Sequence, residues 1–316
     1  SGRWCTRSTA CAPRGEAMSW QAVTLTYRAR SPLLLGRYPL GFIQRTRTFI
    51  PGWTLWGALT ATLTRACFPQ ADGARYEAVG AWVEHNLLTS YAYLLVEGGL
   101  AAPHFRDGGW YYGPLPATQF EARFVTSLGQ TAVAPGSLTA ETNTLHETET
   151  LSPYDLATGE PARWRFTLYR QGSEEVSQSE DEMLAALTPE ALLAALRTLV
   201  VGADRSAGLG RLELETAGAW QAVAGDAWPV PLDRDGPTLR AHVRVADLDG
   251  NQVRGRAEVI PWRWWKNTPD PDGRSWGPGQ QQSVQCCYVP GCEVADDWQP
   301  VVGPWGFWQA QHECGA

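Results

Sequence analysis

Lysine is almost absent from this sequence. Lys266 is the only one, so the other 25 of its 26 basic residues are arginine. Arginine makes bidentate contacts with phosphate and stacks on bases, although a GC-rich genome produces the same bias. The net charge of −7 argues against a protein coated all round with basic charge. A local basic groove is compatible with it, because affinity for phosphate depends on where the arginines cluster.

Long apolar runs are also missing. No stretch of about 18 apolar residues occurs, which excludes a membrane-spanning helix. No tandem repeat at a solenoid period occurs either. Hydrophobic residues nevertheless make up 44% of the 316 residues. That fraction supports a sizeable core in one enlarged or two ordinary domains, and it excludes wholesale disorder.

The cysteines do not form the even set that a disulfide framework needs. There are seven, and no secretory signal precedes them, so we expect a cytoplasmic protein with reduced thiols. Residues 1–17 show neither strand nor helix periodicity, whereas a clean pattern begins at Met18. We expect Met18 to be the natural start and residues 1–17 to be a non-native or disordered leader.

The pattern after Met18 alternates between strands and helices. From Trp20 to Tyr27 the residues alternate as in a half-buried strand. A helix is expected from about Trp53, because leucines recur every four residues. These are Leu55, Leu59 and Leu63. A second helix is expected over 75–88 and a strand over 91–96.

A segment rich in glycine, proline and aromatic residues spans about 98–140. Structureless loops of this length are uncommon in compact domains and are often functional. A strand follows at Trp164–Tyr169, and Thr188 and Pro189 predict a helix start as cap and first helical residue. The buried face of this helix is predicted to hold Leu192, Leu193, Leu196 and Leu199. A glycine-rich turn then leads into a strand.

This order predicts an α+β fold with the ferredoxin-like (RRM-like) pattern over 18–216, interrupted by the 98–140 insertion. The chain changes character over 217–316. A strand pair is expected at Leu239–Val245 and Val253–Ile260, followed by a tail rich in Trp, Pro and Gly. We interpret this C-terminal region as a second small β-rich domain.

Two segments carry a resemblance to a known family. F-I-P-G-W-T-L-W-G-A-L (Phe49–Leu59) follows the first strand and a basic loop, and G-A-D-R-S-A-G-L-G-R (Gly202–Arg211) joins the second helix to the last strand. They resemble the I-P-G-x-x-L-x-G-A-L helix entry and the glycine-rich loop of the RAMP superfamily of CRISPR-associated proteins. Either motif alone is weak, but both occur in the right order.

The resemblance implies an RNA-guided antiviral ribonucleoprotein complex in which this subunit grips the CRISPR RNA. Two further segments resemble stretches of the Cas-five kind, which caps the 5′ handle of the guide in type III-D, other type III and type VII systems. P-H-F-R-D-G-G-W-Y-Y-G-P-L-P-A-T resembles its proline-rich stretch, and L-H-E-T-E-T-L-S-P-Y-D-L-A-T-G-E-P-A-R-W-R-F resembles its turn before the third strand. The implied partners are Cas-seven-type backbone subunits, a large subunit or effector nuclease, and target RNA reached through the complex. A Cas-seven-like backbone subunit, a processing endoribonuclease and an unrelated acidic scaffold are the alternatives.

The glycine loop is the first predicted RNA contact. Gly202, Gly208 and Gly210 allow positive φ and close approach of a phosphodiester, with exposed N–H groups acting as an anion nest. The candidate polar contacts in the same loop are Arg205, Ser206 and Arg211. The structural alternative is a tight helix-to-strand turn whose glycines serve geometry only.

The loop over 36–48 is the second predicted contact. Arg37, Arg45 and Arg47 are interleaved with Tyr38 and Phe42, a mixture that suits single-stranded RNA because arginines hold phosphates while rings stack on splayed bases. The alternative is that Phe42 packs inside and the arginines are solvated. We do not choose Trp53 or Trp56 as stacking residues, because helix periodicity turns one of them to the core.

The insertion over 98–140 is the third predicted RNA contact. By resemblance it forms a thumb that kinks the guide or contacts the adjacent backbone subunit, and its candidate RNA contacts are Arg106 and Arg123. The alternative is a surface loop with its own aromatic cluster.

Residues for catalysis are sparse, so we expect no enzymatic activity. The segment 31–48 contains no Asp or Glu, although target-cleaving Cas-seven-kind subunits carry an acid there. Asp204 is the one carboxylate inside a motif and stands alone. Of the histidines, only His104 and His146 are tolerable candidates for the general acid or base of a processing nuclease.

No cofactor is expected, with one weak exception. The tail presents C-C-Y-V-P-G-C followed by H-E-C, a candidate zinc set that fits no strong template. Its members are Cys286, Cys287, Cys292, His312 and Cys314. Free cysteines are the favoured alternative. The many tail tryptophans favour a core or subunit interface, while Arg254, Arg256, Arg263 and Arg274 leave room for RNA stacking.

Overall fold

The computed structural model describes residues 20–142, 144–171, 182–223, 230–231, 237–248, 250–263 and 281–310. The expected leader at 1–17 lies outside the described residues. Within them, no helix has both the length and the apolarity to cross a membrane.

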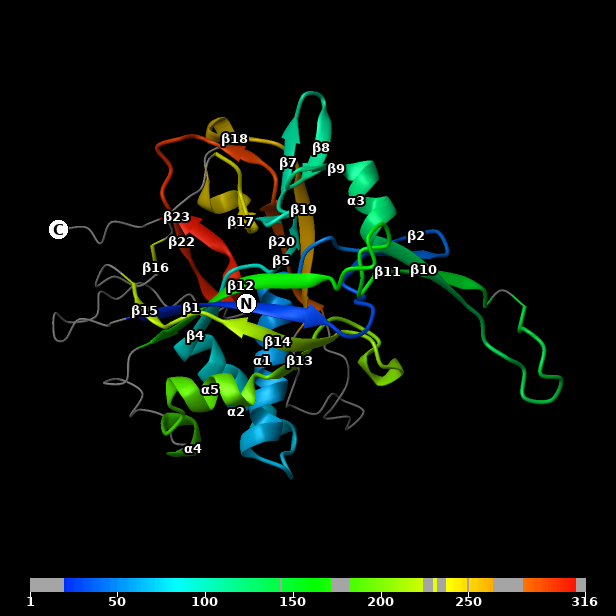
Figure 1. The fold of residues 1–316 in the computed structure, drawn as a ribbon, viewed down its shortest axis with the longest axis horizontal. Coiled ribbons are helices and arrows are strands. Elements are labelled where there is room, and N and C mark those ends of the chain that lie inside the picture. The colour runs from blue at the N-terminus through cyan, green and yellow to red at the C-terminus, as the bar shows by residue number, and fades with distance from the viewer. Residues whose placement is uncertain are drawn as a thin grey trace.

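A large antiparallel sheet organises the first two thirds of the chain (Figure 1). Strand β1 (Trp20–Ala29) lies between β12 (Arg163–Gln171) and β14 (Arg211–Ala217). The full order is β13 (Thr198–Val200), β14, β1, β12, β5 (Tyr93–Val96) and β6 (Gly99–Leu100), with β4 (Leu87–Thr89) on β12 and β15 (Gln221–Ala222) on β1. The alternation in β1 produces the predicted half-buried strand, because every second side chain turns to the core.

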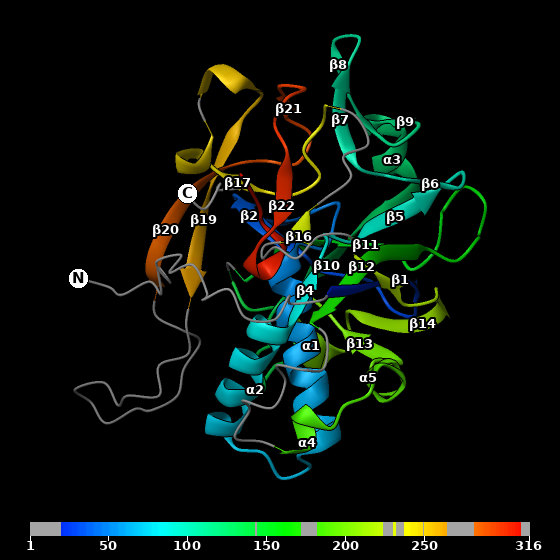
Figure 2. The same ribbon diagram turned by 90° about the vertical axis from the view of Figure 1, so that its left-hand side faces the viewer.

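Helices cover one face of this sheet. They are α1 (Gly52–Cys67), α2 (Gly73–Asn86), α4 (Glu182–Ala185) and α5 (Pro189–Ala195). Figure 2 shows α2 running alongside α1. The predicted α1 leucines are all buried in the main core with Tyr27 and Trp164 of the sheet. The expected cap is confirmed, since the Thr188 side chain accepts a hydrogen bond from Ala191 N. The helix is shorter than predicted, because Leu199 lies on β13.

The segment over 98–140 is an ordered insertion with its own strands and helix. Strands β7 (Pro103–Arg106), β8 (Gly109–Tyr112) and β9 (Leu115–Pro116) form a small sheet beside α3 (Ala117–Phe124). Beyond α3, β10 (Val125–Gln130) and β11 (His146–Leu151) form an arm that projects from the body in Figure 1. The base of this arm joins β3 (Ile43–Thr46) and β2 (Gly36–Leu40) in a four-stranded sheet.

The C-terminal region forms a six-stranded sheet. Its order is β16 (Val230–Pro231), β22 (Pro300–Val302), β23 (Trp308–Ala310), β17 (Val243–Arg244), β20 (Gln281–Tyr288) and β19 (Ala257–Arg263). The two strands predicted as a pair do not pair with each other: β17 and β19 lie on opposite sides of β20. A short second ladder joins β18 (Val253–Arg254) to β21 (Glu293–Val294).

The C-terminal region shares its core with the first part of the chain. Phe49, Tyr91 and Tyr93 pack in one buried cluster with tail residues such as Trp298 and Trp308. The C-terminal strands gather around the N-terminal end of α1 (Figure 2). Trp298 and Trp308 therefore fill a core, one of the two places that the sequence leaves open for the tail tryptophans, and continuous packing crosses the boundary near residue 217.

Candidate nucleic-acid interface

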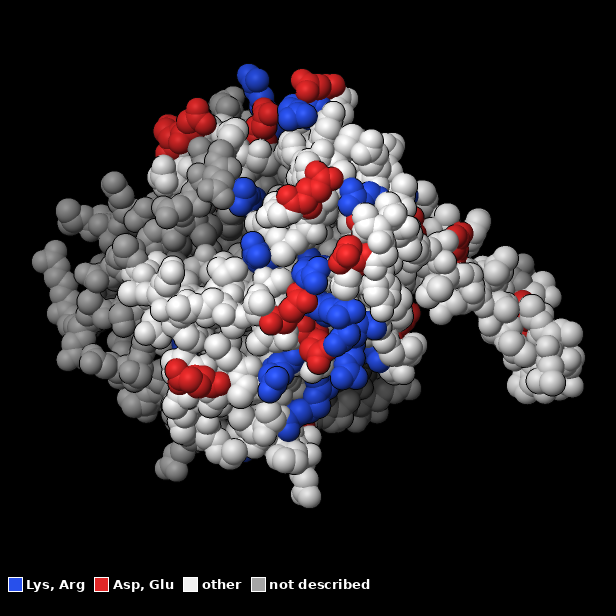
Figure 3. Space-filling view, in the orientation of Figure 1, with Lys and Arg blue, Asp and Glu red and all other residues white. Residues whose placement is uncertain are grey.

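Four arginines line the face of the main sheet that the helices leave open. Arg28 and Arg30 extend from the end of β1, and Arg163 and Arg165 from the start of β12, where Arg28 is paired with Arg163. Their neighbours in sequence, such as Tyr27, turn to the core instead. Figure 3 shows basic side chains, with a few acids, gathered over this end of the sheet.

Sequence reasoning missed these four residues, although the signal was available. Basic and apolar residues alternate in both strands, and a period of two places the arginines on one face.

Ion pairs hold this surface in place without neutralising it. Arg30 Nε lies 2.5 Å from Glu213, and Arg163 Nε lies 2.6 Å from Glu215. Hydrogen bonds from these arginines lower the pKa of both carboxyls, so both are ionised at neutral pH. Arg165 Nε donates to Thr26 Oγ1 at 3.2 Å. Four guanidinium groups against two carboxylates leave the surface positive.

The three glycines of the glycine loop have positive φ, as predicted: Gly202 (81°), Gly208 (87°) and Gly210 (83°). A Cβ on Gly202 would lie 2.3 Å from the Leu34 carbonyl oxygen, and one on Gly210 would lie 1.9 Å from that of Val201. These two glycines therefore allow close packing against the protein's own backbone, at the carbonyls of Leu34 and Val201. Around Gly208 a Cβ would meet no described atom within 4 Å.

Most amides of this loop are already bonded, so the predicted anion nest is wrong for them. Ala203 N donates to Leu34 O at 2.9 Å and Gly210 N donates to Pro32 O at 2.8 Å. Arg211 N donates to Ser31 Oγ at 2.9 Å. The amides of residues 207, 208 and 209 donate to carbonyls within the loop.

The side chains of the loop stay available for the contacts that the sequence predicts. Arg205, Ser206 and Arg211 are exposed, as is Gly208. Arg211 also begins β14, where its carbonyl accepts from Arg30 N at 2.8 Å. The loop therefore runs directly into the arginines of the open sheet face, and we call the two together the basic sheet edge.

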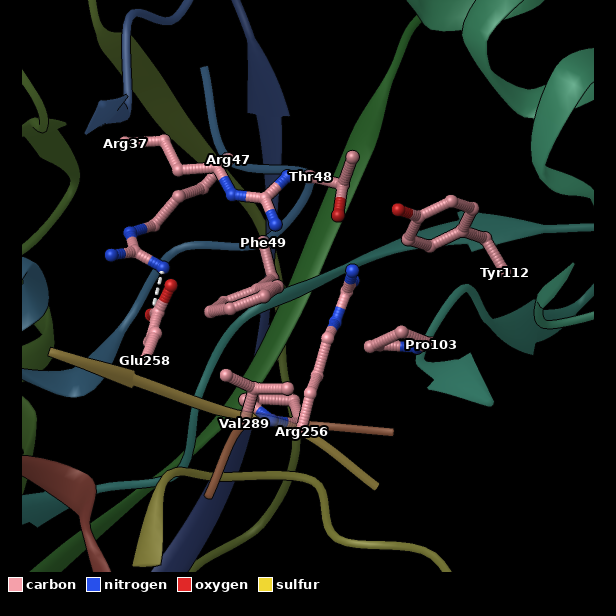
Figure 4. Close-up of a pocket in the computed structure, with 10 residues that line it drawn as sticks. Arg37, Arg47, Thr48, Phe49, Pro103, Tyr112, Arg256, Glu258 and Val289 are labelled. Atoms are coloured by element: carbon pink, nitrogen blue, oxygen red, sulfur yellow. Dashed lines mark hydrogen bonds and ion pairs between the residues drawn. The ribbon is translucent and has the colours of Figure 1, made fainter. Parts of the chain in front are cut away.

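A second basic site lies where the β2–β3 hairpin, β7–β8 and β19 meet. Arg37, Arg47 and Arg256 line a pocket there with aromatic and apolar residues (Figure 4). We call it the junction pocket. Arg45 does not reach it, because Arg45 Nε pairs with Glu149 at 2.7 Å. Phe42 is 63% exposed, so it does not pack inside.

A buried polar chain forms one wall of the junction pocket. Arg47 Nη1 donates to Glu258 Oε1, and the same oxygen lies 2.8 Å from His242 Nε2. Tyr91 Oη lies 2.8 Å from His242 Nδ1. Burial lowers the pKa of His242 and raises that of Tyr91. This geometry fits a neutral imidazole with its proton on Nε2 and a tyrosine hydroxyl that donates to Nδ1.

The carboxylate in this chain is ionised. Burial raises the pKa of Glu258, but hydrogen bonds from His242 and Arg47 and the charge of Arg47 outweigh it and bring the pKa to about 2. With its partners in place, Glu258 is a fixed anion that neutralises Arg47 rather than a proton donor.

The two arginines predicted in the insertion differ in availability. Arg123 is held by Asp155 and Glu97, and its hydrogen bonds lower the pKa of Asp155. Arg106 lies over the Tyr111 ring at 4.9 Å and pairs with Asp107 at 3.2 Å, but both side chains of this pair are mostly exposed, at 64% and 78%. Of the two, only Arg106 presents its guanidinium to a ligand.

The candidate catalytic and zinc residues are dispersed. His104 Nδ1 lies 3.4 Å from the Ala102 carbonyl, and exposed His146 contacts Thr144 and Gln130 in the arm. Cys286 is exposed while its neighbour Cys287 is buried, because adjacent residues of β20 face opposite ways. The described part of the chain contains no group of three metal-ligating side chains. His312 and Cys314 lie outside it.

The fold of this chain is similar to that of chains in solved structures of a type III CRISPR complex. A chain of the Type III-B Cmr-beta complex bound to cognate target RNA and AMPPnP, solved by cryo-EM, has a TM-score of 0.50 and 9% identity, covering 86% of this chain and 85% of that chain. A chain of the same kind of complex bound to cognate target RNA has a TM-score of 0.40 and 13% identity, covering 63% and 96%. No protein-family model matches the sequence, and no curated protein matches it significantly.

Proposed function

We propose that this chain is a non-catalytic RNA-binding subunit of a type III CRISPR effector complex, and that it grips the 5′ handle of the guide. The observation that carries the proposal is the continuity of the basic sheet edge, in which the glycine loop that carries Arg205 ends at Arg211, beside Arg30 of the open sheet face. Single-stranded RNA is held by such arginine clusters through its phosphates.

The fold supports this proposal. The strands lie in the order β14-β1-β12-β5 across the sheet. Along the chain, helices connect β1 to β5 and β12 to β14, which fits the ferredoxin-like domain of the RAMP resemblance. The likeness at TM-score 0.50 extends over both the main sheet and the C-terminal region, because it covers 86% of the chain.

The complex supplies the partners of this proposal. They are the CRISPR RNA, Cas-seven-type backbone subunits, a large subunit or effector nuclease, and target RNA reached through the assembled complex, all in the cytoplasm. A backbone position is the alternative to the cap. The two positions differ in copy number, so native mass spectrometry of the purified ribonucleoprotein distinguishes one copy from several.

The proposal of a binding rather than a cutting subunit rests on how the candidate groups are placed. Asp204 is exposed in the glycine loop, while His104 lies on β7 and His146 on β11. Cleavage needs metal-binding carboxylates or a placed acid and base. Asp204→Ala, His104→Ala and His146→Ala should each leave guide loading and target cleavage intact. Loss of cleavage with normal loading would identify an enzyme.

The RNA contact is tested by removing charge at the loop. Arg205→Ala with Arg211→Ala should weaken binding of a handle-length single-stranded RNA roughly tenfold or more, and should make the dependence of affinity on salt shallower. Arg65→Ala is the matched control, since Arg65 is an exposed arginine at the end of α1, on the helix side. Equal affinity and salt slope in the double variant and wild type would contradict the proposal.

A further inference from the structure

We propose that the junction pocket binds one unpaired nucleotide of single-stranded RNA, with its phosphate between Arg37 and Arg256 and its base against the neighbouring rings. This inference rests on the proposed RNA-binding function and adds a second, separate contact. It also gives the C-terminal region a direct part in binding.

Three segments far apart in sequence build most of the pocket, and Val289 and Pro290 after β20 complete its lining. The β2–β3 hairpin and the residues after it contribute Arg37 and Phe49, the β7–β8 hairpin contributes Tyr112, and the start of β19 contributes Arg256 and Glu258. Figure 4 shows the guanidinium groups of Arg37 and Arg256 pointing into the same space, which the Tyr112 side chain also faces. A ligand there touches all three segments at once.

The charge of the pocket suits a single phosphate. Glu258 is ionised and bonded to Arg47, so these two cancel. Arg37 and Arg256 have no acidic partner among the described residues, and both lie on the pocket wall. Two uncompensated guanidinium groups facing one space favour a phosphodiester, whose oxygens accept charge-assisted hydrogen bonds.

The rings suit an unpaired base. Arg256 lies over the Trp110 ring at 4.6 Å and Arg37 over the Tyr38 ring at 5.0 Å, so each guanidinium group has an aromatic ring beside it. Tyr38 is 48% exposed, and Phe105, whose ring packs edge-on against Trp110 at 5.6 Å, is 47% exposed. Exposed rings beside arginines stack on bases that are splayed out of a helix, whereas a duplex presents only its phosphates.

The pocket is built before any ligand arrives. Gly291 has φ of 97°, and a Cβ there would lie 2.6 Å from the Trp110 ring. Glycine therefore lets the turn after β20 press against β8, which holds Trp110 beneath Arg256. Preorganised side chains lose less entropy when they bind.

The test uses the full chain with Arg37→Gln and Arg256→Gln combined. Gln keeps most of the side-chain volume and removes the charge. Arg65→Gln is the control, because Arg65 is an exposed arginine at the end of α1, on the helix side, that does not line the pocket. Fluorescence anisotropy should measure the affinity for an eight-nucleotide RNA, the same RNA as a duplex, and free nucleoside monophosphates, each at several salt concentrations.

The double variant should bind the single-stranded RNA roughly 10- to 100-fold more weakly, with a salt slope shallower by about 0.7 for the one phosphate lost. Duplex binding should change little, and the control should match wild type. Wild-type affinity and slope in a folded double variant would overturn the inference while leaving the proposed function standing. If wild type binds no RNA, the proposed function fails, and the monophosphate measurement then decides the pocket: binding lost in the double variant supports it, and no binding by wild type overturns it.

Discussion

The backbone of Gly52 packs directly against the carbonyl of Trp305. A Cβ on Gly52 would lie 2.1 Å from that oxygen and 2.8 Å from Gly306 Cα. Gly306 in turn has φ of 75°, and a Cβ there would lie 2.7 Å from the Thr89 carbonyl oxygen. The glycine of the I-P-G motif thus serves the joint between the first helix and the C-terminal region, a role that the motif alone does not reveal.

Gly52→Ala should therefore destabilise the protein strongly. A methyl group cannot be accommodated against backbone atoms, so we expect a loss of about 3 kcal/mol or more in the free energy of unfolding, measured by urea titration. Gly57→Ala is the control within the same helix. A Cβ there meets no described atom within 4 Å, so alanine should stabilise by roughly 0.5–1 kcal/mol through helix propensity. Equal effects of the two substitutions would contradict this account.

Arg47 and Arg45, both in the segment 36–48, should differ in how much they contribute to stability. Arg47→Gln leaves the largely buried Glu258 without its cationic partner, which should cost roughly 2–4 kcal/mol of stability. Arg45→Gln removes an ion pair in which the arginine side chain is 32% exposed, and should cost about 1 kcal/mol or less. Chemical denaturation measures both. A small loss for Arg47→Gln would show that the buried chain from Arg47 to Tyr91 contributes little.

The sequence predicted local structure well where one periodicity dominates. The alternation in Trp20–Tyr27 and the Leu55, Leu59 and Leu63 repeat each report which side of an element is buried, and both were confirmed. Strand pairing in the tail was not predictable in this way, because β20 supplies the partner for both β17 and β19 from beyond residue 280.

The candidate site was only partly predictable for the same reason. The glycines of the loop predicted its positive φ values. They did not predict that the carbonyls of Pro32 and Leu34 would accept hydrogen bonds from its amides. Arg37 was found from its aromatic neighbours. Arg256 joins it only through the tertiary fold, and nothing local to residue 256 predicts a shared pocket.

Acid should destabilise the protein in two pH windows. Burial lowers the pKa of His242 below its ordinary 6.5, so the unfolded chain takes up this proton first and stability falls as pH drops below about 6.5. Glu258 has a folded pKa of about 2 against an ordinary 4.5. Its contribution is complete above 4.5 and is lost as pH falls from 4.5 toward 2.

Glu258→Gln isolates the second window. The difference in unfolding free energy between wild type and this variant should shrink by roughly 2–3 kcal/mol between pH 6 and pH 2, because only wild type loses the Glu258 charge. The other ion-paired carboxyls, such as Asp155, titrate in both proteins and cancel in the difference. A difference that stays constant with pH would show that Glu258 is not stabilised as an anion.

The glycine loop has a structural function and a proposed RNA-binding function, and these should depend on different glycines. Gly210 should matter more for stability and Gly208 more for RNA binding. Gly210 has φ of 83°, and a Cβ there would lie 1.9 Å from the Val201 carbonyl oxygen, so Gly210→Ala should cost well over about 2 kcal/mol of stability through a backbone clash. Gly208 has φ of 87° with open space around it, so Gly208→Ala should cost only the roughly 1–2 kcal/mol of a left-handed alanine.

The effect on RNA affinity should come from the substitution at Gly208. A folded Gly208→Ala protein places a methyl group on the exposed surface beside Arg205, and should weaken single-stranded RNA binding by several-fold if a phosphodiester approaches there. Gly208→Ser changes the same surface while adding a hydroxyl donor, and should recover part of the affinity. Anisotropy titration below the melting temperature of each variant measures this. Full wild-type affinity in Gly208→Ala would move the RNA path off the loop backbone and leave only the arginine side chains of the basic sheet edge to hold it.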